Sequence, residues 1–273
     1  MNCIFCGKET SNSKSVEHII PQSLGNNTAI LPKGIVCDAC NNYFARKVEG
    51  PLLNSDEYRM LRQELKIPNK SGKLINNYTN RMLENFEIKQ ITEGVYCICT
   101  PIETSRDDIP EVFDEYNKYV EDTDNNLITP NKHMSWLLSK MAVEYFVYRC
   151  GCSHDVCEYI TNDEVFKPIR QYARFGNREI WPYSARRIYS RNTIYKGDFF
   201  SYVSWESDIF FMGRGEVYFV IAIHGIEYAI NFGGPVIDGY LVWLKEHNGI
   251  SPLYADKSLL EKEREDYIKK QTE

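Results

Sequence analysis

Two Cys-x-x-Cys pairs near the N-terminus constrain this chain more than any other feature. The pairs are Cys3/Cys6 and Cys37/Cys40, and the run Glu17–Pro21 (EHIIP) lies between them. Two such thiolate pairs complete a four-cysteine tetrahedral zinc site. That site has no open position for water, so the zinc is expected to be structural. A segment of about fifty residues has too small a core to fold alone, and zinc binding supplies stability that it lacks.

The local pattern around the cysteines predicts a short hairpin followed by a helix. His18 follows a polar stretch and precedes Pro21, which indicates a strand end that runs into a loop. Residues 41–49 include several good helix formers, and Gly50–Pro51 after them predicts that the helix ends there. The second cysteine pair then lies at the helix entrance, and Asn41 lies on its first turn.

These residues resemble the HNH nuclease family, in the subgroup whose finger reads CxxC, then EHIIP, then CxxCN. The resemblance covers residues 3–53, about a fifth of the chain. It depends on segments that agree in order and spacing: Cys3–Gly7, Glu17–Pro21, Leu24–Asn26, Val36–Cys40 and Asn41–Asn42. The resemblance implies a two-stranded hairpin and a helix around one catalytic divalent cation, a ββα-metal finger.

The resemblance also implies roles for three side chains. His18 is expected to be the general base on water, and Glu17 and Asn41 are expected to bind a catalytic Mg²⁺ or Mn²⁺. Carboxylate and carboxamide oxygens suit these hard cations. An imidazole with an unperturbed pKa near 6.5 can accept a proton at neutral pH. The implied reaction is metal-assisted hydrolysis of phosphodiester bonds in DNA.

Two positions in the finger stay open at this stage. The family's middle Asn braces the loop before the second cysteine pair, but residues 31–36 contain no Asn. Asn26 or Asn27 is the candidate replacement. Glu49 lies about two turns along the expected helix from Asn41. It either reaches the site or lies on a solvent-exposed face, and the exposed position is the preferred interpretation.

Composition indicates an ordinary globular chain. With 273 residues, 43% hydrophobic and 26% charged, it has room for a finger at 1–55 and a second domain at 56–273. We expect an α+β fold, in which the second domain mixes helices with antiparallel strands. No apolar run approaches the roughly 18 residues that span a bilayer, so no membrane partner is expected.

The remaining cysteines and the N-terminus favour a cytoplasmic protein. Met1–Asn2–Cys3 leads directly into the finger, which leaves no room for a signal peptide. Outside the finger lie an odd number of cysteines: Cys97, Cys99, Cys150, Cys152 and Cys157. We interpret these as reduced thiols.

Charge is distributed unevenly along a chain whose net charge is −6. Residues 102–124 are strongly acidic, whereas residues 167–196 contain eight basic residues against Glu179 alone, with aromatic residues between them. One interpretation is a nucleic-acid surface in which arginines bind phosphates. Its candidates are Arg170, Arg174, Arg178, Arg186, Arg187 and Arg191. The alternative is a basic face that pairs with the acidic segment, and the two stay evenly balanced.

Hydrophobic periodicity predicts the other elements. Helices are expected at 56–65, 133–149, 163–175, 239–246 and 259–270. Strands are expected at 86–91, 94–100, 208–212, 216–223 and 226–232, with a two-residue hairpin turn at His224–Gly225. Lys140 and Glu144 have the four-residue spacing of an ordinary helix ion pair.

The sequence therefore predicts a DNA endonuclease with a structural zinc and a catalytic Mg²⁺ or Mn²⁺. The larger domain would serve recognition, homo-oligomer assembly or a regulatory partner. Two alternatives remain. One is a zinc finger that binds nucleic acid without cutting it. The other is a defence or toxin effector whose nuclease is gated by the C-terminal domain.

Overall fold

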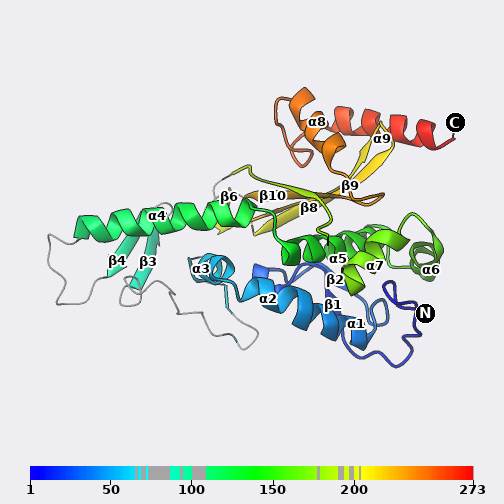
Figure 1. Cartoon of the computed structure of the whole chain (residues 1–273), viewed down its shortest axis with the longest axis horizontal. Coiled ribbons are helices and arrows are strands. Elements are labelled where there is room, and N and C mark those ends of the chain that lie inside the picture. Colours follow the sequence, from blue (N-terminus) through cyan, green and yellow to red (C-terminus); the bar gives the residue numbers. More distant parts are fainter. Residues whose placement is uncertain are drawn as a thin grey trace.

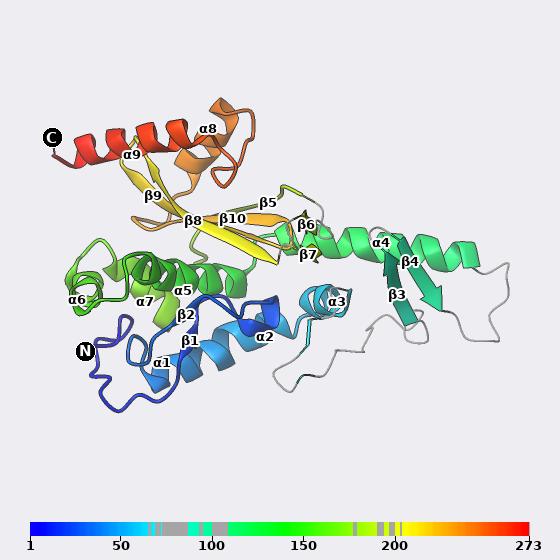
Figure 2. The same ribbon diagram turned by 180° about the vertical axis from the view of Figure 1, so that it is seen from behind.

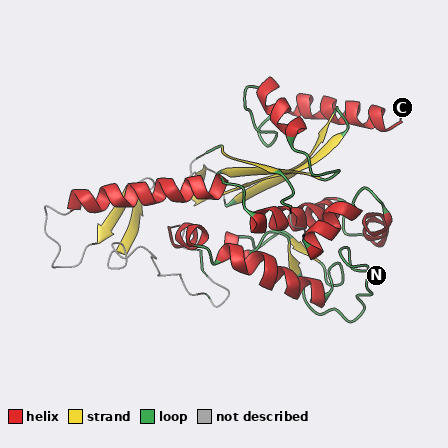
Figure 3. Ribbon diagram, in the orientation of Figure 1, coloured by secondary structure: helices red, strands yellow, loops and turns green. Residues whose placement is uncertain are grey.

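The structure is a computed structural model. It describes residues 1–64, 67–68, 72, 87–92, 95–99, 109–176, 179–189, 194–196, 200–202 and 204–272. Figure 3 shows helices on both sides of an antiparallel sheet, and this arrangement confirms the expected α+β class. No helix in these ranges is both long enough and apolar enough to cross a membrane.

The N-terminal finger has the order strand, strand, helix. Strand β1 (Glu17–His18) pairs antiparallel with β2 (Ile30–Leu31), and a single 3₁₀ turn, η1 (Gln22–Leu24), lies between them. Helix α1 (Asp38–Tyr43) follows and is continued by the π turn η2 (Phe44–Glu49) and by α2 (Gly50–Leu53).

The expected helix end at Gly50–Pro51 is wrong, because the helix continues to Leu53. A π turn precedes the proline, and the hydrogen-bond pattern returns to that of an α-helix at Gly50. Pro51 has no N–H to donate, but it lies in the first turn of α2, where proline is tolerated. π turns inside helices often occur at functional sites, and this one ends at Glu49.

The rest of the chain alternates helices with short strands. Its first elements are α3 (Asp56–Glu64), β3 (Glu87–Thr92), β4 (Val95–Cys99), α4 (Ile109–Ile128), α5 (Lys132–Arg149), α6 (His154–Asn162) and α7 (Lys167–Phe175). They are followed by β5 (Tyr183–Arg187), β6 (Ile194–Lys196), β7 (Phe200–Tyr202), β8 (Trp205–Met212), β9 (Glu216–Ile223), β10 (Ile226–Asn231), α8 (Asp238–Glu246) and α9 (Lys257–Thr272). The predicted helix at 163–175 begins only at Lys167, with Pro168 in its first turn.

The main sheet has the antiparallel order β5-β10-β9-β8. Strands β9 and β10 are joined by the predicted turn at His224–Gly225, and Ile223 pairs with Ile226 across it. Both turn residues are left-handed, with φ of 47° and 83°. This is the backbone that a two-residue hairpin turn requires, and Gly225 adopts it without a Cβ penalty.

The sheet is covered on both faces (Figures 1 and 2). Along β9, alternate residues face opposite sides, as strand geometry dictates. Phe219 and Ile221 join the large core that contains α5 and the finger, whereas Tyr218 packs with Tyr240 and Trp243 of α8. In both views α4 extends away from the sheet, with β3 and β4 beside its far part.

Helix α5 lies between the finger and the sheet (Figure 1). Most of its residues from Met134 to Val147 are buried, so it is enclosed on nearly all sides rather than along one stripe. Its buried residues belong to the same core as Cys3, Leu31 and Phe44 of the finger. The division of the chain at residue 55 stays a prediction, but the packing of the finger depends on α5.

Candidate zinc centre and active site

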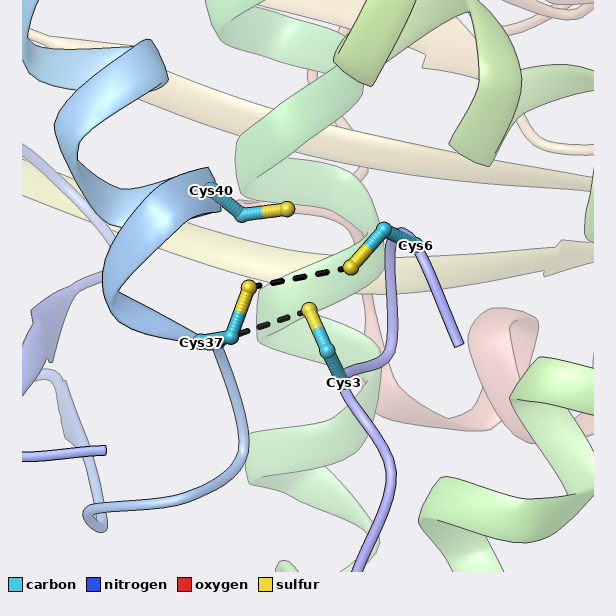
Figure 4. A group of neighbouring side chains, drawn as sticks. All are labelled: Cys3, Cys6, Cys37 and Cys40. Carbon is cyan, nitrogen blue, oxygen red and sulfur yellow. Dashed lines mark hydrogen bonds between the residues drawn. The ribbon is translucent and has the colours of Figure 1, made fainter. Parts of the chain in front are cut away.

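The four cysteines of the finger come together in one cluster. Cys3 and Cys6 lie on the N-terminal segment, and Cys37 and Cys40 lie at the start of α1 (Figure 4). Their Sγ atoms all lie within 4.8 Å of one another, and those of Cys6 and Cys37 are 3.6 Å apart. Four sulfurs at about 2.3 Å from a tetrahedral zinc ion have this kind of spacing, so the cluster fits a structural zinc.

Local hydrogen bonds prepare the cluster for a cation. A hydrogen bond with Cys40 lowers the pKa of the Cys3 thiol to about 5, despite burial, and backbone contacts add to this effect. The Cys37 amide donates to Cys3 Sγ at 3.4 Å. The bond with Cys3 and burial both raise the pKa of Cys40. Zinc binds cysteines as thiolates, so zinc binding releases thiol protons and depends on pH.

Two arginines of α7 lie against this cluster, although the sequence placed them among the candidates for a nucleic-acid surface. Arg174 donates from Nε to Cys40 Sγ at 3.2 Å, and its guanidinium lies 4.1 Å from the centre of the Tyr43 ring. Arg170 is buried and donates to the carbonyls of Ile4 and Thr161 at 2.5 and 2.6 Å. Ile4 is part of the first cysteine loop, so Arg170 joins that loop to α6.

Arg174 is expected to stabilise bound zinc, because four thiolates and one Zn²⁺ carry a net charge of about −2. Arg174→Met should weaken zinc binding about 10- to 100-fold, the usual effect of removing a hydrogen-bond partner of a metal ligand. Equilibrium competition with a chromogenic chelator measures this. The matched control is Lys167→Met on the same helix, where the lysine pairs with exposed Glu164 at 3.0 Å. Equal zinc affinity in the two variants would contradict this role.

The strand that carries Glu17 and His18 lies directly beside the entrance of α1. Asn41 Nδ2 donates to the carbonyl of Val16, the residue before Glu17, at 2.9 Å. Asp38, also on the first turn of α1, accepts from the amides of Lys14 and Ser15 at 3.1 and 2.9 Å. The hydroxyl of Ser15, which also donates to Asp38, and then these amides hold the pKa of Asp38 below its ordinary value. These bonds hold the residues just before β1 against the first turn of α1, the turn that carries Asn41.

The loop between β1 and β2 is held by Asn26, which settles the choice between Asn26 and Asn27. Its Nδ2 donates to the carbonyls of Ile20 and Ala29, at 2.8 and 2.9 Å. Its Oδ1 accepts from the amides of Thr28 and Ala29, both at 2.9 Å. Asn26 is fully buried, whereas Asn27 is exposed. A carboxamide suits this position because it donates and accepts at once.

A buried charge cluster contacts β1 through Glu17 and the His18 carbonyl. Its centre is Lys140 Nζ from α5, which is completely buried. Within 3.3 Å lie five oxygens: Glu17 Oε1 (2.7 Å), Glu49 Oε1 (3.1 Å), Glu144 Oε2 (3.2 Å) and the carbonyls of His18 (2.8 Å) and Ile19 (3.3 Å). The preferred interpretation of Glu49 as an exposed residue is wrong, because its side chain is only 14% exposed and contacts Lys140.

The electrostatics of this cluster follow from its burial. Burial alone lowers the pKa of Lys140, but the carboxylates of Glu144, Glu17 and Glu49 together raise it well above its ordinary value. Lys140 is therefore a permanent cation at neutral pH. Burial raises the pKa of Glu144 well above its ordinary value, and the nearby Lys140 opposes this shift. The cluster thus places one fixed ammonium against the carboxylate of Glu17.

Two other arginines of the basic segment, Arg186 and Arg187, make intramolecular ion pairs. Arg186 contacts buried Glu227 at 2.6 Å, and Arg187 contacts Asp124 at 2.7 Å. Asp124 belongs to the acidic segment 102–124. The Arg187–Asp124 pair therefore agrees with the alternative in which the basic segment pairs with the acidic one. Arg178 and Arg191 lie outside the described residues. A role of these arginines in nucleic-acid binding stays a prediction.

Comparison with known families agrees with the geometry of the finger. Residues 3–57 match the family model of the HNH endonucleases. Over these residues the chain is similar to the HNH endonucleases. Searches of curated proteins and of solved structures returned no match. The match ends inside α3. The similarity to nucleases therefore covers the finger and not the rest of the chain.

Lys140 and Glu144 are the main residues around the HNH finger that sequence reasoning misjudged. Their spacing suggested an ordinary ion pair, but both side chains are 0% exposed. One signal was available in the sequence: Lys140 and Glu144 stand within a run, 136–147, that is otherwise dominated by apolar residues. Charged residues in a buried helix need partners, and here the partners come from the finger.

Proposed function

We propose that this protein is a metal-dependent endonuclease that hydrolyses phosphodiester bonds in DNA. His18 is the general base, and Glu17 and Asn41 hold the catalytic Mg²⁺ or Mn²⁺. The observation that carries the proposal is the hydrogen bond from Asn41 to Val16. It joins the first turn of α1 to the strand of Glu17 and His18. The similarity of residues 3–57 to the HNH endonucleases supports the same reaction class.

The donor atoms around Glu17 fit a hard cation. Because Asn41 donates through Nδ2 to Val16, its carboxamide oxygen Oδ1 is the atom left to face a ligand. Glu17 contributes a carboxylate at the edge of the buried region, 7% exposed, whose Oε1 is held by Lys140. Oxygen ligands of these two types are those that Mg²⁺ and Mn²⁺ prefer. A bound cation would stabilise the charge that develops on phosphate and on the leaving oxygen.

The chain's own residues supply the remaining chemistry. His18 is partly exposed but its Nδ1 is buried, so Nε2 is the ring nitrogen expected to reach a water molecule. It is expected to take the proton of that water as the water attacks phosphorus. The backbone of His18 is held in place by its pairing with Ile30 and by Lys140. Asn26 holds the loop that follows, and so keeps β1 and β2 in register.

Asn41→Ala separates the catalytic cation from the zinc. The variant should keep its zinc, because Asn41 is not a zinc ligand, but it should need a higher Mg²⁺ or Mn²⁺ concentration for half-maximal cleavage. Loss of a coordinating side chain or its partner costs about 10- to 100-fold in metal affinity. Plasmid nicking across a metal titration, with and without EDTA, measures this. Asn42→Ala, at the exposed neighbouring position, is the matched control.

The wild-type assay also separates the alternatives. DNA retention without cleavage in either metal would favour a non-catalytic zinc finger. Cleavage that begins only after a cell extract is added would favour an effector gated by its C-terminal region. Loss of zinc from the Asn41 variant would show that this residue belongs to the zinc centre instead.

A further inference from the structure

The ammonium of Lys140 is directed at the strand that carries the proposed catalytic residues. Of the five oxygens that it contacts, three belong to residues 17–19. Lys140 comes from the middle of α5, 122 residues after His18 in the sequence. Its side chain is 0% exposed, so it reaches neither solvent nor DNA.

Burial of this lysine is costly unless its contacts are good. Removing an ammonium from water is strongly unfavourable, and only close partners of opposite charge and well-placed acceptors offset the cost. A solvent-exposed lysine could form the same ion pair with a glutamate four residues away and would not lose its hydration. The buried arrangement joins α5 both to the side chain of Glu17 and to the backbone that follows it.

Strand β1 is short. It consists of two residues, and its ladder with β2 has two pairs, Glu17–Leu31 and His18–Ile30. An isolated two-stranded hairpin is marginally stable at best. Asn41 holds the carbonyl of Val16, before the strand, and Lys140 holds the carbonyls of His18 and Ile19 at its end. The strand is thus held at both ends by residues from helices.

We propose that Lys140 is a positioning residue of the nuclease site, which sets the orientation of the Glu17 carboxylate and of the His18 backbone from α5. The inference rests on the proposed function of Glu17 and His18. It gives the larger C-terminal region a direct part in the reaction: α5 completes a site whose reacting groups all lie in the finger. A displacement of about 1 Å at a reacting group can cost about 10²-fold in rate.

The test uses the full chain with the double substitution Lys140→Met/Glu144→Leu. Replacing a buried ion pair with apolar residues of similar volume is often neutral for folding, and the double substitution removes the fully buried Glu144 carboxylate together with the lysine. Glu17 and Glu49, which are 7% and 14% exposed, remain without the ammonium, and the thermal melt measures the cost of this change. The matched control is Arg149→Gln/Asp208→Asn, which removes an exposed ion pair from the same helix. Both proteins are compared with wild type by thermal melt, zinc content, hydrogen exchange, DNA affinity and single-turnover cleavage.

The double variant should fold and bind zinc like the wild type. Amides of residues 17–31 should exchange faster, and those of 3–8 should not change. Cleavage should fall about 10²-fold at unchanged DNA affinity. The control should match the wild type in every measurement. If Lys140 only stabilised the fold, the double variant would have a lower melting temperature, and its cleavage rate would not fall selectively at unchanged DNA affinity.

The remaining outcomes distinguish the two proposals. Unchanged exchange and unchanged cleavage in a folded double variant would overturn the positioning role and leave the nuclease intact. A double variant that fails to fold would also overturn it, because Lys140 would then support the whole core. The third outcome is faster exchange at residues 17–31 in the double variant together with no DNA cleavage by the wild type. It would support the anchoring of β1 by Lys140 and contradict the nuclease assignment.

Discussion

His18→Ala should reduce DNA cleavage by about 10²- to 10⁴-fold, the range that a general base contributes. The substitution removes the imidazole from β1 but leaves its backbone pairing with Ile30 and the contact from Lys140 to the His18 carbonyl. Zinc content and the thermal melt should therefore stay at wild-type values, because the four ligands of the zinc are cysteines. Single-turnover cleavage of plasmid in Mg²⁺ measures the effect.

His154→Ala is the control for this experiment. His154 is 62% exposed and lies near Asp155 and Glu158 on α6, away from the finger strands. Its removal should change neither cleavage nor stability. Wild-type cleavage by the His18 variant would remove the nuclease assignment from this site.

Cys40→Ser should release the zinc and disrupt the finger. Structural zinc sites contribute on the order of 10 kcal/mol to folding, far more than a single packing contact. Cys40 is fully buried and shares the core with Phe44 and Leu137, so loss of the metal should also expose apolar surface beside α5. Elemental analysis should find less than one zinc per chain, and the thermal melt should shift strongly downward.

The exposed thiol of Cys150 provides the matched control. Cys150→Ser makes the same atomic change on the surface and should keep both zinc and stability. A Cys40 variant that retained one zinc per chain and the wild-type melting temperature would contradict the four-cysteine site. A chelator added to wild type should reproduce the effect of the Cys40 variant, because both remove the same ion.

Local signals in the chain were enough for the zinc cluster and the ββα order. The Cys-x-x-Cys spacing places two sulfurs on one side of a tight turn, and the flanking residues predict a strand before the second pair and a helix after it. The β9–β10 hairpin was equally accessible, because the two-residue turn at His224–Gly225 depends on neighbouring residues alone. Such features are governed by interactions over a few residues.

The partners of charged side chains could not be obtained in this way. Arg174 reaches Cys40 across 134 positions in the sequence, and Lys140 reaches His18 across 122. The pattern around each residue describes its own helix but says nothing about the element that packs against it. A basic residue in a mixed segment therefore looked like a candidate phosphate ligand, although Arg174 lies against a zinc ligand.

Residue types and short spacings thus predict which metal suits the cysteine cluster and which side chains of the finger are candidates for the reaction. The environment of those groups depends on how α5 and α7 pack against the finger. Burial changes the energy of a charge far more than local sequence does, and burial is a property of the assembled core. Lys140 and Glu144 illustrate the difference: four residues apart, they read as a simple helix pair, and only the packing of α5 against β1 shows that Lys140 holds the strand of Glu17 and His18.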